Sequence, residues 1–307
     1  MPDRPARPSG QERFEAPALT PIDTAQRGRG PFFWRFNRYH RWTHAAVIIS
    51  FFLLAYTGLP LRFSCATWAP ALMDLLGGVE MAGLLHRVGA VITFGYFAMH
   101  IGFIIVKVVR TPDRRRLFWG PDSIVPQPHD VRDFIEQFRW FFRLGPKPRF
   151  GRFSYMEKFD YFAVFWGVAI IGGSGLLLWF PEFFAGFLPG WVFNVAMVVH
   201  GEEALLATGF IFTIHFFNVH FRPDKFPLDA VMFHGRATAE YLEEEHPGMV
   251  HRLKTLPGEQ TSPLAVPDLQ APPPGIGSSL ASTVFGFLAL GLGVLCVGLI
   301  LWGVFFC

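Results

Sequence analysis

Long apolar stretches alternate with polar segments along the chain, and five of the stretches are long enough to cross a membrane. They lie at about residues 44–63, 82–109, 159–180, 192–221 and 280–306. The hydrocarbon core of a bilayer is about 30 Å thick, which a helix of about 20 apolar residues spans. The pattern therefore predicts an all-α membrane protein with a four-helix transmembrane bundle and one additional C-terminal helix.

The polar segments predict how the chain is divided. Residues 1–32 contain prolines and arginines but no apolar h-region, so we expect a disordered leader and no signal peptide. Residues 33–255 hold the four-helix core. Residues 256–279 include SPLAVPDLQAPPPG and form a Pro-rich linker, and residues 280–307 form the additional helix.

Lysine and arginine are concentrated on one side of the predicted spans. The segment before the first span carries five arginines between Arg27 and Arg41, and the connection between the second and third spans is rich in both residue types. The connections at residues 64–81 and 181–191 contain neither. Because basic loops stay on the cytoplasmic side, we expect a cytoplasmic N-terminus and a C-terminus outside.

Composition narrows the class of function. Apolar residues make up 51% of the chain and the net charge is only +3, with arginines clustered beside apolar runs, so membrane lipid is an expected partner and nucleic acid is not. The three cysteines form neither C-x-x-C nor C-x-x-C-H. This excludes zinc ribbons, dithiol redox sites and covalent c-type haem, and it does not imply a disulfide.

Histidines recur inside the spans at two depths. At about 100° and 1.5 Å per residue, the fourteen-residue interval from His86 to His100 keeps both rings near one helix face, about 21 Å apart in depth. His200 and His215 are fifteen residues apart, which a π-bulge near Gly209 would bring back toward one face. With the N-terminus inside, the second and fourth spans both enter the membrane from outside. His86 and His200, which come early in these spans, therefore share an outer level.

The inner level holds three histidines, because His44 begins the first span at the depth of His100 and His215. Ionisable residues within membranes are costly and mark functional sites. A haem iron needs two axial nitrogens that approach a flat macrocycle from opposite faces, so two levels of histidine indicate two non-covalent b-type haems. Arg87 outside, and Arg38 and Arg41 inside, are placed to meet haem propionates.

Two segments carry a family resemblance. THAAVIISFFLLAYTGLPLRF in the first span and HGEEALLATGFIFTIHFFNVHFRPDKFPLD in the fourth resemble the cytochrome b subunits of formate dehydrogenase and their relatives in the bacterial di-haem cytochrome b561 superfamily, over residues 33–255. The resemblance implies that His86 and His200 ligate the outer haem, that His44 and His215 ligate the inner one, and that quinone binds near the inner haem.

A second assignment of the inner pair stays open. The segment LHRVGAVITFGYFAMHIG is also similar to the helix of respiratory cytochrome b in which both histidines bind haem, which would pair His100 with His215 and leave His44 to contact a propionate or quinone. We prefer His44. The candidate cofactor-binding residues are His44, His86, His200, His215, His100, Arg41 and Arg87, and further candidates for the quinone site are His220 and Asn218.

These features predict an electron-transfer subunit in the bacterial inner membrane. It would pass electrons between quinone and a separate redox subunit of the multihaem cytochrome, iron-sulfur or molybdenum enzyme type, and that partner would carry the substrate chemistry. Two alternatives remain. One is a self-contained transmembrane reductase of the b561 type, and the other is a haem-free, histidine-dependent proton-coupled transporter, which usually needs membrane-embedded Asp or Glu as well.

Overall fold

The computed structural model describes residues 32–255 and 270–307. The expected leader falls outside these residues except at Phe32, and so does most of the expected linker. The predicted order within both segments therefore stays an expectation.

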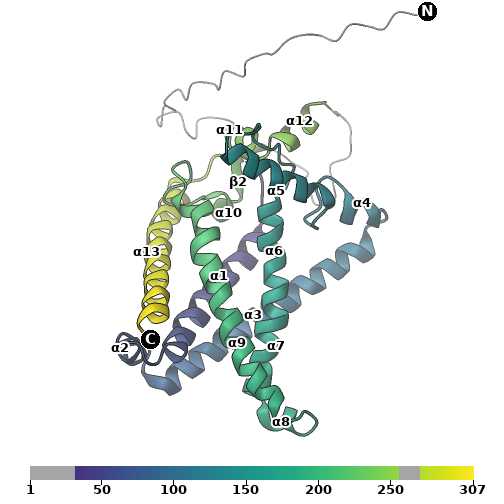
Figure 1. Cartoon of the computed structure of the whole chain (residues 1–307). Helices are drawn as coiled ribbons and strands as arrows, with labels where there is room; N and C mark the ends of the chain where they lie inside the picture. Colours follow the sequence, from purple (N-terminus) through teal and green to yellow (C-terminus); the bar gives the residue numbers. More distant parts are fainter. Residues whose placement is uncertain (1–31, 256–269) are drawn as a thin grey trace, which may run out of the picture. The chain divides into compact units, whose positions relative to one another are not determined.

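Five helices in the described part of the chain are long and apolar enough to cross a membrane (Figure 1). This confirms the predicted number of spans and the all-α membrane class. Two spans contain π-helical turns, labelled η, in which hydrogen bonds skip one residue more than in an α-helix. The spans are α1 (Arg38–Arg62); α3 (Gly78–Arg110); α6 (Tyr155–Gly167) with η1 (Val168–Gly172) and α7 (Gly173–Trp179); α9 (Trp191–Phe210) with η2 (Ile211–His215) and η3 (Phe217–Phe221); and α13 (Ile276–Phe306).

Shorter helices gather at the two ends of the spans (Figure 1). We call the end with the C-terminus the disulfide end, for the bond described below, and the opposite end the basic end, for the arginines in its connections. The disulfide end carries α2 (Ala69–Leu75) and α8 (Pro181–Ala185). The basic end carries α4 (Arg114–Trp119), α5 (Pro128–Phe141), α10 (Val231–His234), α11 (Ala239–Glu245) and α12 (Pro247–Thr255).

The first four spans pack as two pairs. α1 lies along α3, and α7 lies along α9, whereas α1 and α9 touch at few positions. Gly89 permits the first pairing, because a Cβ there would lie only 3.0 Å from Cγ of Leu54 on α1. The helix starts are set locally: the side chain of Asn37 accepts a hydrogen bond from the His40 amide at the start of α1, and Ser154 and Glu157 form a capping box at α6.

The fifth span packs through small residues. Gly286, Ala289, Gly293, Cys296 and Gly303 are buried along one face of α13. This face meets Phe63 at the end of α1 and Phe212 and Phe216 of the fourth span, in one apolar cluster. The additional helix is thus part of the packed structure.

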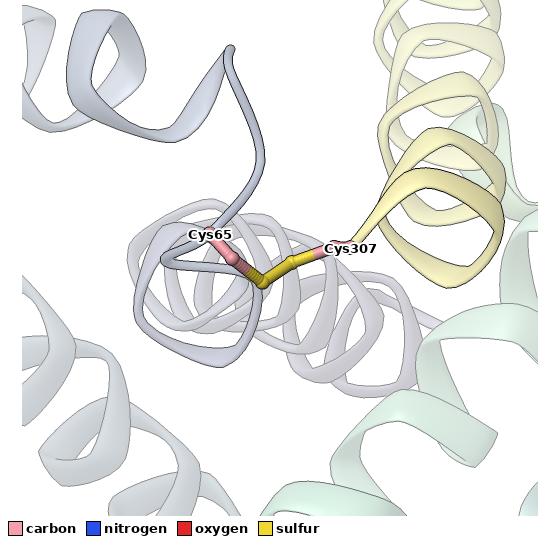
Figure 2. The surroundings of a disulfide bond; sticks show 2 residues. All are labelled: Cys65 and Cys307. Carbon is pink, nitrogen blue, oxygen red and sulfur yellow. A yellow bond between two sulfur atoms is a disulfide. The ribbon is translucent and has the colours of Figure 1, made fainter.

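A disulfide ties the end of α13 to the segment after α1 (Figure 2). It joins Cys65 and Cys307, which are 242 residues apart in sequence. The cysteine pattern did not imply this bond. The pairing depends on how α13 packs, which the spacing of the cysteines does not reveal.

A small antiparallel sheet at the basic end was not expected. Its order is β2 (Arg236–Thr238), β1 (Phe32–Trp34), β3 (Gln270–Ala271), with Phe33 opposite both Ala237 and Gln270. Strands of two or three residues are too short to show an alternating pattern. Through β1 and β3 the sheet holds together the segments that lead into α1 and α13.

Candidate functional site

His86 and His200 face each other across the two helix pairs. Their ring centroids are 6.1 Å apart and their planes are inclined at 66°. His86 comes from α3 and His200 from α9, so each pair contributes one ring. The structure therefore brings together the two residues that we predicted at the outer level.

Neighbouring polar groups fix the tautomer of both rings. The Thr57 hydroxyl donates to the Leu53 carbonyl at 2.6 Å, so it accepts from Nδ1 of His86, which lies 2.9 Å away. Nδ1 of His200 lies 2.9 Å from the Ile171 carbonyl, which can only accept. A proton on each Nδ1 leaves Nε2 of each ring with its lone pair, which is the form that binds a metal.

Glycines make room for these rings. A Cβ at Gly175 on α7 would lie 3.0 Å from Cε1 of His200, and one at Gly58 on α1 would lie 3.6 Å from Cε1 of His86. The first distance is too short for an undisturbed ring, whereas the second is an ordinary contact. Gly175 therefore permits the position that His200 occupies.

His215 is held by an acid of the third span. Its Nδ1 lies 2.8 Å from Oδ2 of Asp160 on α6. Oδ1 of Asp160 is buried and bonds to no residue that the structure describes. Sequence reasoning missed this residue, although an ionisable side chain inside an apolar span was the signal that could have found it.

The fifteen-residue interval from His200 to His215 contains a π-helical turn. The turn, η2, begins at Ile211, two residues after Gly209, and ends at His215. A π-turn inserts one residue without breaking the helix. The π-bulge predicted near Gly209 is therefore confirmed.

His44 on α1 lines an open cavity of about 400 Å³. The other lining residues are Arg38, Arg41, Trp42, Ala45, Ile48, Met232 and Phe233.

His100 has a different environment. The Tyr39 hydroxyl lies 2.9 Å from its Nδ1 and the Tyr161 hydroxyl lies 2.8 Å from its Nε2. The ring also stacks on Tyr39 and Phe103. Metal binding at His100 would require one of these tyrosine contacts to be given up.

The other predicted residues lie beside the histidines. Nε of Arg41 donates to the Phe233 carbonyl at 2.5 Å, at the edge of the cavity. Arg87 directly follows His86 on α3. His220, a further candidate for the quinone site, is buried, and its Nδ1 lies 2.8 Å from the Pro227 carbonyl.

Two acids within the fourth span have structural partners. Glu202 forms a 2.7 Å ion pair with Arg62 of α1, and Glu203 accepts a 3.3 Å hydrogen bond from the Trp166 indole. Both contacts tie neighbouring spans together.

Comparison of the chain with models of protein families gave no match, and comparison with curated proteins gave none either.

Proposed function

We propose that this protein is a b-type cytochrome subunit that transfers electrons between membrane quinone and a separate redox subunit. In this proposal two non-covalent haems are ligated by His86 with His200 and by His44 with His215. The observation that carries it is the facing pair of His86 and His200, each with its Nδ1 proton bonded and its Nε2 lone pair left over.

The spacing of this pair suits one metal ion between the rings. Imidazole nitrogens bond metals at about 2.0 Å, so two rings on opposite sides of an ion have centroids about 6 Å apart. The centroids of His86 and His200 are 6.1 Å apart. The sparse contact between the two helix pairs also fits a flat macrocycle held between helices.

For the inner pair, His44 and His215, the main support for a haem is the carboxylate that orients His215. Metal-binding histidines commonly donate their second ring proton to a carboxylate, which orients the ring and raises its basicity. Asp160 provides this acceptor for His215. His44 then supplies the second nitrogen, with the positive charges of Arg38 and Arg41 nearby for carboxylate groups.

A bound haem would supply one-electron redox chemistry. In the proposal, polar residues near the basic end exchange the protons that quinone takes up or releases. The cavity beside His44 is open and mostly apolar, with two arginines at its rim. The hydrogen-bonded series of Tyr39, His100 and Tyr161 carries exchangeable protons between α1, α3 and α6. In the proposal these residues bind the quinone head group and exchange its protons.

The disulfide supports the orientation that we propose. Disulfides persist in oxidising compartments, and this one lies at the end whose connections lack lysine and arginine. In the proposal the disulfide end lies outside the cytoplasm and the N-terminus inside, in a bacterial inner membrane, and both features support this orientation.

Asp160 also favours a second candidate, a haem-free proton-coupled transporter. A buried carboxylate bonded to a histidine within a span is what a proton relay requires. A reduced-minus-oxidised spectrum of the purified protein separates the two candidates. The cytochrome proposal requires a b-type α band, and a purified chain without bound haem would contradict it.

Histidine variants test the assignment of the ligands. His86→Ala and His200→Ala should each remove one of two haems, and His44→Ala should remove the other. His100→Ala should retain both. Loss of a haem from His100→Ala together with full haem occupancy in His44→Ala would reverse the inner assignment. A separate observation, whether other subunits co-purify with the chain, would distinguish an electron-transfer subunit from a self-contained reductase.

A further inference from the structure

Helix α5 at the basic end turns its apolar side outward. Five side chains, which we call the α5 stripe, each expose between 46% and 63% of their surface: Val131, Phe134, Ile135, Phe138 and Phe141. At about 100° per residue they occupy an arc of about 120°. In water a helix packs such a face against the protein core, so this arrangement needs an apolar medium or an apolar partner.

Helix α5 also carries two buried acids, which lie about 80° and 140° around the helix from the centre of the stripe. Asp130 and Asp133 are 8% and 9% exposed, and the ammonium group of Lys158 bonds both carboxylate oxygens of Asp130 at 2.8 and 2.9 Å. Burial raises the pKa of the Asp133 carboxyl. The orientation of α5 is thus fixed by a buried ion pair, and the outward position of the stripe follows from it.

The same ion pair sets the depth of α5. Lys158 lies in the first turn of α6, where the third span begins. Phe134 of the stripe also packs on Tyr155, the first residue of that span, with ring centroids 5.6 Å apart. A helix fixed to the first turn of a span lies at the level of the lipid headgroups.

Arginines line the stripe on one side. Arg132 and Arg139 lie within about 60° of Ile135 around the helix, Arg143 comes two residues after the end of the helix, and all three are exposed. Helix α4 repeats the combination, with exposed Trp119 one turn after exposed Arg115. Apolar and aromatic side chains next to exposed arginines match the boundary between acyl chains and anionic headgroups.

We infer that α5 is an interfacial helix that binds anionic phospholipid, with its stripe in the acyl boundary and Arg132, Arg139 and Arg143 on the headgroup phosphates. The inference rests on the membrane-spanning character of the chain and on the contacts of α5. It does not depend on haem or quinone.

Spin labels on the full-length protein in vesicles test the depth of the stripe. A label at Ile135→Cys, in a Cys296→Ala background with the disulfide intact, should be accessible to oxygen and protected from a water-soluble nickel complex. A label at His129→Cys, on the opposite side of the same helix, should show the reverse. Nickel access at both positions would overturn the inference, and so would protection of position 135 from both reagents, which indicates a protein cover.

Lipid composition tests the charge requirement. Vesicles that contain phosphatidylglycerol should give a higher oxygen-to-nickel ratio at position 135 than vesicles of phosphatidylcholine alone, and added salt should reduce the difference. The triple variant R132Q/R139Q/R143Q should weaken docking by about fivefold per arginine, whereas R132K/R139K/R143K should retain it. Equal ratios in both lipids would refute the anionic preference.

Discussion

Nδ1 of His215 and Oδ2 of Asp160 lie 2.8 Å apart and join the third and fourth spans. At the outer level the corresponding acceptors are neutral, a threonine hydroxyl for His86 and a backbone carbonyl for His200. The two candidate haem levels therefore differ in electrostatics. A carboxylate stabilises the more positive, oxidised form of a metal bound by its histidine partner, so the inner site should have the lower reduction potential.

Asp160→Asn tests this difference. The variant should raise the midpoint potential of one haem, leave the other unchanged and weaken retention of the affected haem by about 10- to 100-fold. A redox titration followed in the visible spectrum measures both effects. Thr57→Val is the reciprocal control, because it removes the acceptor of His86 and should affect only the outer haem. If both haems shift in Asp160→Asn, the carboxylate does not act through His215.

Gly175 and Gly173 offer a matched pair of substitutions on α7. A Cβ at Gly175 would lie 3.0 Å from Cε1 of His200, whereas a Cβ at Gly173 would have no atom within 4 Å. Gly175→Ala should displace the His200 ring and lower the occupancy of the outer haem. Gly173→Ala should keep both haems and, because alanine favours helix, should change stability by about 0.5 to 1 kcal/mol at most.

Haem content per polypeptide and the spectrum of the retained haem give the readout for this pair. Equal haem content in the two alanine variants would show that His200 tolerates the added methyl group, which would argue against a constrained outer site.

The apolar pattern predicted the spans well, because the length and composition of a membrane helix are local properties of the sequence. The residues that support the histidines could not be found in this way. Thr57 and Ile171 meet their histidines only through helix packing, and Ile171 contributes a backbone carbonyl, which no side-chain pattern shows. The interval of fifteen residues did predict the π-turn η2, because a helix with an extra residue has few other ways to keep two rings on one side.

The Cys65–Cys307 disulfide gives a test of orientation. If the disulfide end faces an oxidising compartment, a membrane-impermeant maleimide should label intact cells only after an impermeant reductant has opened the bond. Cys296 is buried and should not react in either state. Cys65→Ser and Cys307→Ser should each expose one thiol without reductant, and labelling that requires cell lysis would reverse the proposed topology.

His246 predicts how stability depends on pH. It is 2% exposed, and its Nδ1 lies 2.9 Å from the Gly151 carbonyl, while its Nε2 lies 3.2 Å from Nη2 of Arg35. The carbonyl requires a proton on Nδ1 and the guanidinium requires a lone pair on Nε2, so the ring is neutral. Burial, with the charge of Arg35, lowers the pKa of His246 to about 4 despite the opposing charge of Glu157.

A histidine with a lowered folded-state pKa binds its proton more readily in the unfolded chain, so acid favours unfolding. The contribution of His246 to stability is complete above about pH 6.5, its ordinary pKa, and falls as the pH drops from 6.5 toward 4. The full shift corresponds to about 3 kcal/mol. His246→Gln can keep both hydrogen bonds but does not titrate, so its thermal midpoint should fall less between pH 7 and pH 4.5 than that of the wild type. Parallel curves for the wild type and His246→Gln would show that His246 does not titrate in this range.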